Sequence, residues 1–314
     1  MLQTQPASAM RAELSAPTPE LRAFLSAHCC ADHDVSTLEA LVSGFAEDRM
    51  VVVRDAGEPT LLGCVVRDLA NPDQASEIIL LAGLEGAGLP PALGVLQDRA
   101  EQLVLAGKQR RIELQVPARL TGIEPVLERL GYYRAWENIR VELEPLAPRR
   151  RQRCTMPDGA AWQDVDDRTV EASYRCYARA FRTVPGGQVP SLEDYARVLP
   201  PLVPPQRILV RSGQVLAFVR AGWACEPTRT GEIFSLGTDP DALLPGLGAL
   251  TVGEAVRVLG LMGATRAELT VSSRNLLARG LYARFGFTEK CRRAVLHKDL
   301  RGDRSSGDAS GRAR

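Results

Sequence analysis

The most regular hydropathy pattern in this chain begins at Arg266. The apolar residues Ala267, Leu269 and Val271 alternate with polar residues over six positions. Successive side chains of a β-strand point to opposite faces of the sheet, so this alternation predicts a half-buried strand. The strand should place its apolar face against a core and leave its polar face more accessible.

A short helix is predicted directly after this strand. Asn275 is a residue type favoured at the N-cap of a helix, and Ala278, Leu281 and Tyr282 follow at spacings that place them on one helical face. Gly286 stands where such a helix should end, because glycine adopts the left-handed conformation without strain. The segment therefore predicts a strand, a capped helix and a stop.

Similar patterns predict the other elements. The second half should contain helices at 168–182, 191–198 and 246–261, a hairpin of strands at 207–211 and 215–222, and strands at 231–237 and 294–300. The first half repeats this order, with helices at 37–47 and 93–105 and strands at 50–54, 61–67, 77–82, 111–116 and 136–143. Hairpins followed by a β-loop-α-β unit predict an α/β fold class, in the form of an α+β mixed sheet flanked by helices.

Similar segments recur at a nearly constant separation along the chain. Three pairs lie 155 positions apart: R-x-E-L-x-V at Arg111 and Arg266, Glu-Ile at Glu77 and Glu232, and Gly-aromatic at Gly131 and Gly286. A fourth pair, Leu89–Gly94 and Leu243–Gly248, lies 154 positions apart. A period of this length indicates two copies of a domain rather than a solenoid of small repeats.

The duplication predicts two tandem domains with a linker between them. We expect an N-terminal domain at 17–146, a linker at 147–153 that contains Pro148 and three consecutive arginines, and a C-terminal domain at 154–300. Residues 1–16 and 301–314 have no apolar periodicity, so both ends of the chain are expected to be disordered.

Composition narrows the possible partners. The formal net charge of the 314 residues is +1, so no global field attracts nucleic acid or an anionic membrane. The longest apolar stretch, Ile78 to Leu84, is too short to span a bilayer, and residues 1–19 do not resemble a signal peptide. Seven scattered cysteines are typical of a reducing compartment, which favours a cytoplasmic location.

One cluster contains residue types that bind metals. His28, Cys29, Cys30 and His33 lie close together in the sequence. Their spacing fits no standard zinc motif, and no second cluster supplies further ligands. We therefore expect no metal site in this protein.

The segment from Asn275 to Phe287 carries the pattern N-x-x-A-x-x-L-Y-x-x-x-G-F. This pattern resembles the C-terminal motif of the GNAT superfamily of acyl-CoA-dependent N-acyltransferases. The resemblance implies two tandem GNAT-like domains and acetyl-CoA as the co-substrate. Its specific motifs fall mainly in residues 207–300, which makes the C-terminal domain the candidate for catalysis.

A glycine-rich loop precedes the predicted helix at 246–261. Gly246 and Gly248 allow backbone N–H groups to approach a ligand, and the helix dipole there favours a phosphate. The loop resembles the GNAT pyrophosphate loop, Q/R-x-x-G-x-G/A, except that Leu243 occupies its first position. One side-chain contact to phosphate is therefore missing, and binding of CoA should be weakened but retained. The residues expected to hold the cofactor here are Leu244, Pro245, Gly246, Leu247, Gly248 and Ala249.

Two side chains are assigned catalytic roles by the resemblance. Glu232 occupies the position of a glutamate that acts as the base for the substrate ammonium, and an amine needs such a base before it can attack a thioester. Tyr282 matches the tyrosine that donates a proton to the departing thiolate. Alternatively, Glu232 is a surface carboxylate at a strand end and Tyr282 is a packing aromatic.

Backbone groups complete the expected site. By resemblance, Leu236, Gly237 and Thr238 supply backbone contacts to the pantetheine and to the thioester oxygen, where donors stabilise the developing oxyanion. Asn275 is expected either to contact the pantetheine or the loop, or to act only as a helix cap.

The first copy has lost most of these features. Ala92 replaces the first loop glycine, and Leu120 and Leu127 stand where the second copy has Asn275 and Tyr282. The N-terminal domain is therefore expected to be degenerate. The C-terminal half is most similar to tandem superfamily members that acetylate the cysteinyl amine of a sugar-linked thiol, although this similarity does not define the substrate.

Two functions remain open at this point. The first is an acetyl-CoA-dependent N-acetyltransferase that acts on a primary amine of a small molecule, as a monomer or homodimer. The second is a non-catalytic tandem scaffold or acyl-CoA-binding protein, which Leu243 and the altered first copy would favour. Joint retention of Glu232, Asn275 and Tyr282 argues for the enzyme.

Overall fold

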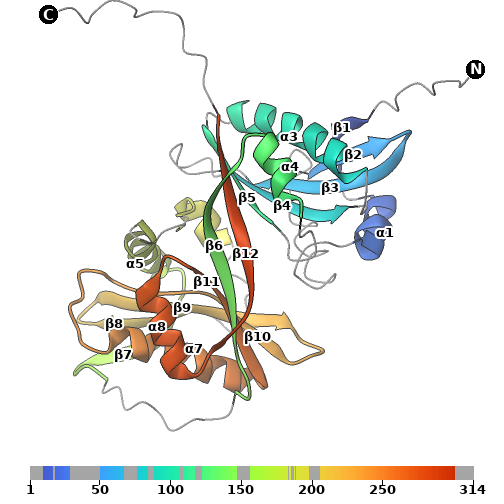
Figure 1. Cartoon of the computed structure of the whole chain (residues 1–314). Helices are drawn as coiled ribbons and strands as arrows, with labels where there is room; N and C mark the ends of the chain where they lie inside the picture. The colour runs from blue at the N-terminus through green and yellow to red at the C-terminus, as the bar shows by residue number, and fades with distance from the viewer. Residues whose placement is uncertain are drawn as a thin grey trace, which may run out of the picture. The chain divides into compact units, whose positions relative to one another are not determined.

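The structure is a computed structural model (Figure 1). It describes residues 10–16, 18–28, 50–66, 76–83, 88–106, 109–116, 122–146, 156–182, 184, 187, 189–197 and 206–300. The chain divides into two compact units, which we describe separately. Unit 1 comprises Met1–Ala135 and Val295–Arg314, and unit 2 comprises Trp136–Ala294.

Unit 2 is built on a mixed sheet with the strand order β6-β11-β10-β9-β8-β7. These strands are β6 Tyr133–Leu143, β7 Ala160–Asp164, β8 Arg207–Arg211, β9 Gln214–Cys225, β10 Thr230–Thr238 and β11 Arg266–Ser272. Strands β10 and β11 run parallel, whereas the other described pairings of this sheet are antiparallel. The predicted mixed sheet is therefore confirmed.

Helices cover both faces of this sheet. On one face, α7 Leu247–Met262 and α8 Leu276–Phe285 pack over β9, β10 and β11 in a core that includes Val219, Ile233 and Leu269 (Figure 1). On the other face, α5 Val170–Arg182 and α6 Leu192–Arg197 pack against Phe218 and its neighbours. Burial of apolar side chains on both faces of the sheet is the main interaction that stabilises unit 2.

Unit 1 repeats the architecture, with the strand order β1-β2-β3-β4-β5-β12. Its strands are β1 Arg11–Leu14, β2 Met50–Asp55, β3 Glu58–Val66, β4 Ser76–Gly83, β5 Arg111–Gln115 and the end of β12 Thr288–Asp299. Its helices are α1 Pro19–His28, α3 Leu89–Ala106 and α4 Glu124–Arg129.

The duplication is visible in the registers of the two sheets. Glu77 pairs with Glu113 between parallel strands β4 and β5, and Glu232 pairs with Glu268 between β10 and β11. Both residues of the second pair lie 155 positions after those of the first. Gly131 and Gly286, which are separated by the same interval, both adopt a φ of 91°.

The final strand of each predicted domain lies in the sheet of the other unit. The end of β6 pairs antiparallel with β11 in unit 2, whereas the end of β12 pairs antiparallel with β5 in unit 1. The compact units therefore differ from the expected consecutive blocks 17–146 and 154–300. The period of a strand records which face is buried but not which strand lies beside it, so the exchange could not be predicted from hydropathy.

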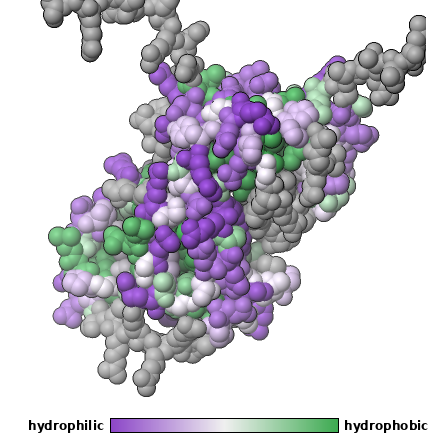
Figure 2. Space-filling view, in the orientation of Figure 1, coloured by the Kyte–Doolittle hydropathy of each residue, from purple (hydrophilic) through white to green (hydrophobic). Residues whose placement is uncertain are grey.

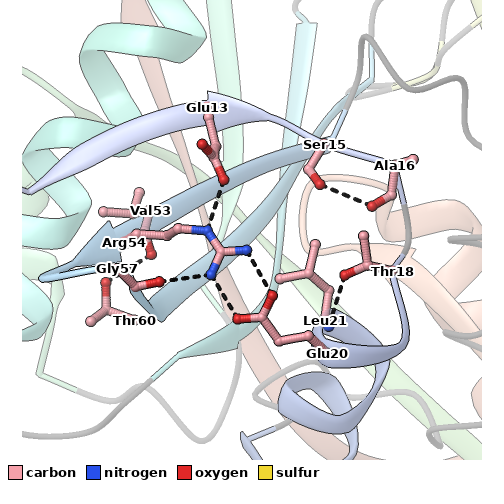
Figure 3. Close-up of polar contacts among 10 residues, drawn as sticks. All are labelled: Glu13, Ser15, Ala16, Thr18, Glu20, Leu21, Val53, Arg54, Gly57 and Thr60. Atoms are coloured by element: carbon pink, nitrogen blue, oxygen red, sulfur yellow. Dashed lines mark hydrogen bonds and ion pairs between the residues drawn. The ribbon is translucent and has the colours of Figure 1, made fainter.

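The expected disorder of residues 1–16 is wrong for Arg11–Leu14, which forms the edge strand β1 beside β2. Figure 3 shows the contacts that fix this region. The Arg54 guanidinium donates hydrogen bonds to Glu13 on β1 at 2.7 Å and to Glu20 on α1 at 2.7 and 3.0 Å. An ionic contact between distant segments leaves no local signal in the sequence. Helix α1 does carry a local signal that we did not predict, because Leu21, Phe24 and Leu25 are buried at helical spacing after the cap residue Thr18.

The elements predicted for the second half are all present, with small changes in their ends. The last strand begins at Thr288 rather than at residue 294, and the edge strand β7 was not predicted. The predicted helix at 37–47, the linker at 147–153, the tail at 301–314 and the residues Cys29, Cys30 and His33 lie outside the described residues. Within the described part of the chain, no helix combines the length and apolar character needed to cross a membrane.

Candidate active site

Glu232 lies on β10, on the sheet face that α5 covers. Its carboxyl group is partly buried, and no described residue donates a hydrogen bond to it. Burial raises the pKa of this carboxyl above its usual value, and the neighbouring Glu268 acts in the same direction. The guanidinium groups of Arg140 and Arg293 oppose the increase without cancelling it. Glu232 therefore has the environment of a proton acceptor rather than that of a paired surface carboxylate.

Glu268 occupies the adjacent position on β11 but is neutralised. Arg140 on β6 donates a hydrogen bond to its carboxylate, with an Nε–Oε2 distance of 2.8 Å and a second contact from the same guanidinium. Both side chains are largely shielded from solvent. Of the two neighbouring carboxylates, Glu268 is engaged in an ion pair, and Glu232 is the one without a hydrogen-bonded cation.

Strands β10 and β11 separate directly after Glu232. Their described register contains three pairs, of which Glu232 with Glu268 is the last, although both strands continue. A register shift at Ile233–Ser235 against β9 marks a β-bulge in β10. Beyond it, Leu236, Gly237 and Thr238 remain paired with β9 on one side only. Backbone groups on their other side point toward the gap between the parallel strands, which fits the predicted contacts to a thioester.

Packing explains the glycine in this segment. A Cβ atom at Gly237 would lie 2.7 Å from Cε1 of Phe218 and 3.1 Å from Cβ of Ala180. Any larger residue would therefore push β10 away from α5 and β9 at the point where its backbone must be held. Gly237 positions the strand, and a functional contact of its backbone remains a prediction.

The loop before α7 has the geometry of an anion cradle. Gly246 is the N-cap of α7 with a φ of 80°, a conformation that glycine adopts without strain. The first turn of the helix contains no acidic residue, and its backbone N–H groups have no acceptor within the helix. The positive end of the helix dipole is therefore available to a pyrophosphate.

Leu243 departs from the loop pattern and is 90% exposed. Leu247 is buried and anchors the start of the helix, whereas Leu244 and Ala249 are partly buried and Pro245 is exposed. Leu276 and Leu277, at the start of α8, are also exposed. Figure 2 shows apolar surface on this side of unit 2. The rim of the cradle is therefore apolar at the position where the motif normally supplies a polar side chain.

Gly248 brings α7 close to α8. A Cβ atom at this position would lie 3.3 Å from Cδ2 of Leu281. The close approach sets the N-terminus of α7 beside the helix that carries Tyr282. The second glycine of the loop thus has a packing role in addition to any contact with phosphate.

Asn275 caps α8 as predicted. Its side-chain oxygen accepts a hydrogen bond from the backbone N–H of Ala278 at 3.2 Å. Asn275 therefore acts as a helix cap, which was one of its two expected roles. A contact of Asn275 with pantetheine remains a prediction. Gly286 ends the helix in the left-handed conformation, which confirms its predicted role.

Tyr282 lies on the inner face of α8 and is buried. Its ring packs edge-on against Phe287, with centroids 5.9 Å apart. Burial raises the pKa of its phenol to about 12, so the hydroxyl remains protonated at neutral pH. No described residue hydrogen-bonds this hydroxyl. The ring of Tyr282 therefore has a packing role, and its phenol proton remains available to a ligand.

An ion pair that the sequence did not reveal anchors the start of the loop. Asp239 follows β10, is fully buried at its side chain, and accepts hydrogen bonds from Arg179 of α5 at 3.0 and 2.5 Å. Burial opposes ionisation, but the bonds from Arg179, from the N–H of Asp241 and from Gln214 hold the pKa of Asp239 below its usual value. Arg179 and Asp239 are 60 residues apart, so no local pattern links them.

Unit 1 does not reproduce this geometry. Helix α3 begins at Leu89, so Ala92 and Gly94 lie inside a helix rather than in a loop before one. Leu127 is buried at the position that corresponds to Tyr282, and Leu120 lies outside the described residues. Helix α4 starts after Ile123, which makes no side-chain cap.

Comparisons with known proteins agree with this geometry. Residues 168–287 match the model of the acetyltransferase (GNAT) family. A mycothiol acetyltransferase from Beutenbergia cavernae is 42% identical over 73 residues, which cover 23% of this chain and 25% of that relative, so this match spans a quarter of the relative's length. A mycothiol acetyltransferase from Geodermatophilus obscurus is 28% identical over 226 residues, covering 69% of this chain and 71% of the relative.

Solved structures support the tandem fold. A GCN5-related N-acetyltransferase from Sphaerobacter thermophilus superposes with a TM-score of 0.69 at 17% identity, covering 94% of this chain and 96% of that one. A tandem GNAT protein from the clavulanic acid biosynthesis pathway gives a TM-score of 0.68 at 14% identity, with coverages of 93% and 98%. At these identities the likeness concerns the fold, and it confirms the expected tandem arrangement of GNAT-like domains.

Proposed function

We propose that this chain, in which residues 168–287 form an acetyltransferase domain of the GNAT family, transfers an acetyl group from acetyl-CoA to a primary amine of a small molecule. Unit 2 carries the reaction in this proposal. The observation that supports it best is Glu232, a carboxyl group without a hydrogen-bonding partner among the described residues, at the point where β10 and β11 separate.

The chemistry follows from the two titratable groups and the backbone between them. Glu232 accepts a proton from the substrate ammonium, directly or through water, which leaves the amine lone pair free to attack the thioester carbon. Backbone groups at Leu236–Thr238 stabilise the oxyanion that develops on the thioester oxygen. The phenol of Tyr282, which is protonated at neutral pH, donates its proton to the departing thiolate.

The loop at Leu244–Ala249 and the N-terminus of α7 fit the pyrophosphate of acetyl-CoA. A left-handed Gly246, the positive end of the α7 dipole and the absence of a first-turn acid all favour a bound anion, although the N–H of Leu247 already donates to the carbonyl of Leu244 at 3.3 Å. Leu243 itself supplies no charged or polar contact to phosphate, so we expect moderate rather than tight binding of the co-substrate. In the described chain no group of acidic, cysteine or histidine residues is suited to a metal, and the proposal requires none.

The experiment that tests this proposal is calorimetric titration of the full-length protein with acetyl-CoA, followed by assay of CoA release with primary amines. Gly246→Glu places a carboxylate in the cradle and should abolish binding. Gly213→Glu is the matched control, because Gly213 also has a positive φ and open space around its Cα but lies in the β8–β9 turn. Loss of binding in both variants would indicate a general effect of the substitution.

The alternative is a non-catalytic scaffold. Two observations favour the scaffold: Leu243 is exposed in the loop of unit 2, and the equivalent segment of unit 1 is part of helix α3 rather than a loop. If the wild-type protein does not bind acetyl-CoA, the scaffold becomes the better explanation. Binding together with amine-dependent release of CoA would exclude it. We further propose a cytoplasmic protein that acts as a monomer or homodimer, which sedimentation analysis can test.

A further inference from the structure

Arg220 and Ser235 face each other across β9 and β10 at the bulge that follows Glu232. The two residues are register partners. The Nε atom of Arg220 and the hydroxyl of Ser235 are both buried, and neither has a hydrogen-bond partner in the described chain. Buried polar groups normally find partners because leaving one unpaired costs free energy. Two such groups side by side therefore indicate a site for a ligand.

This pair lies on the same face of the sheet as Glu232. Gly222 is the register partner of Glu232, and Arg220 lies two residues before it on β9, so their side chains point to the same side. Successive Cα atoms of a strand advance about 3.3 Å, which places the two register positions about 7 Å apart along β9. A small molecule can therefore span from Ser235 to Glu232.

The guanidinium of Arg220 is held in place before any ligand binds. It lies over the ring of Tyr195, 5.6 Å from the centroid. Tyr195 is fully buried, and its hydroxyl is 2.7 Å from the hydroxyl of Ser173 and also contacts the amide of Gln206. This network fixes the ring, so little side-chain entropy remains to be lost when a ligand binds.

The charges on this face leave Arg220 uncompensated. Arg140 is neutralised by Glu268, whereas no carboxylate pairs with Arg220 in the described chain. A guanidinium presents its N–H groups as a planar fork that matches a carboxylate, and a neighbouring hydroxyl adds a further donor. A neutral ligand group would leave the positive charge unbalanced.

We infer that the acceptor amine also carries a carboxylate, and that Arg220 and Ser235 bind this carboxylate while the amine reaches Glu232. The inference rests on the proposed function, because it assigns the second end of the same substrate. It specifies the substrate class as amino acids or other amines that bear an acidic group a few bonds away. Arg220 is in this view a residue that determines specificity and not one that takes part in proton transfer.

The test uses three acceptors that differ only in their terminal group: 4-aminobutyrate, 4-aminobutanol and butylamine. Release of CoA by the full-length wild-type protein should show kcat/KM at least about tenfold higher for 4-aminobutyrate than for the other two, because a charge-assisted contact is lost in them. Arg220→Gln should remove this preference, mainly through KM, so that kcat/KM for 4-aminobutyrate falls to about the value for butylamine in the same variant. Arg220→Lys keeps the charge without the fork and should be intermediate.

Arg211→Gln is the matched control, since Arg211 is an exposed arginine on β8. Acetyl-CoA titration of each variant shows whether the fold and the co-substrate site persist. A second measurement, titration of 4-aminobutyrate into protein saturated with CoA, reports acceptor binding independently of turnover. A binding heat for 4-aminobutyrate that disappears in Arg220→Gln but persists in Arg211→Gln would support the carboxylate site even if no acetyl transfer occurred.

The outcomes separate the two hypotheses. Equal use of all three amines, or a carboxylate preference that survives Arg220→Gln, would overturn the inference and leave the acetyltransferase proposal intact. A preference for the amino alcohol would also overturn it. Binding of 4-aminobutyrate that depends on Arg220, without transfer to any amine, would contradict only the proposed catalysis. If 4-aminobutyrate does not bind and no amine is acetylated, both the inference and the proposed catalysis would be contradicted.

Discussion

Glu232 and Glu268 occupy one register position on adjacent parallel strands, but only Glu268 is paired with a cation through hydrogen bonds. The difference arises because Arg140 on β6 reaches the carboxylate of β11 and engages it directly. As a result, two chemically identical side chains at the same level of the sheet have different environments. One holds a structural ion pair, and the other is left to titrate.

The rate of acetyl transfer should depend on ionisation of Glu232. Because the pKa of this carboxyl is raised, it becomes deprotonated only as the pH rises above its usual value of 4.5. The value of kcat/KM should therefore fall as the pH is lowered through this raised pKa. Glu232→Gln should lower the rate at neutral pH about 100-fold, as expected for loss of a general base, and remove this acidic limb. If kcat/KM of the Glu232→Gln variant still falls at acidic pH as it does in the wild-type protein, this fall would be due to the titration of another group.

The phenol of Tyr282 should affect turnover much more than binding. Tyr282→Phe removes the proton donor and keeps the ring that packs on Phe287, so kcat should fall about 100-fold while the affinity for acetyl-CoA changes little. Stopped assays of CoA release and calorimetry measure the two quantities. Tyr133→Phe in unit 1, which removes a hydroxyl bonded to Asp299, serves as the control. Unchanged kcat in Tyr282→Phe would leave the tyrosine with a packing role alone.

The buried Asp239 should stabilise unit 2 in a pH-dependent way. Asp239→Asn weakens the bonds to Arg179 and should lower the free energy of unfolding at pH 7 by about 2 kcal/mol. The pKa of Asp239 is lower in the folded protein, so its contribution is complete above the usual value of 3.8 and is lost as the pH falls from there toward the lowered pKa.

Urea denaturation at pH 7 and at acidic pH measures this effect. The control is Asp241→Asn, because Asp241 is mostly exposed and lies 3.9 Å from Arg179. It should change stability by only a few tenths of a kcal/mol. A larger loss in Asp241→Asn than in Asp239→Asn would contradict the assignment of the anchor.

Fragments of the chain should reveal the exchanged strands. A fragment of residues 136–294 retains the part of β6 that pairs with β11, whereas a fragment of residues 154–300 lacks it and leaves an edge of β11 open. Open edges promote aggregation, so the second fragment should be less soluble and less stable to heat. Light scattering and thermal denaturation of both fragments measure this difference. Equal behaviour of the two would show that β6 contributes little to unit 2.

Much of the fold follows from local features of the sequence. The alternation at Arg266–Ser272 specifies a strand, Asn275 and Gly286 specify the ends of α8, and Gly246 specifies the start of α7. Each of these signals acts over one or two turns of the chain. The repeat of 155 positions also indicated two copies of one architecture, because equivalent residues of a duplication adopt equivalent positions.

The identity of neighbouring strands and the environment of Glu232 were decided only by the tertiary structure. Arg140 and Glu268 lie 128 residues apart, and the strand that carries Arg140 was assigned by sequence to the other copy. Likewise, the opposition of Arg220 and Ser235 depends on a bulge whose position no local pattern records. Hydropathy determines which face of a strand is buried, whereas the partner of a strand and the charge beside a carboxyl are set by contacts between distant parts of the chain.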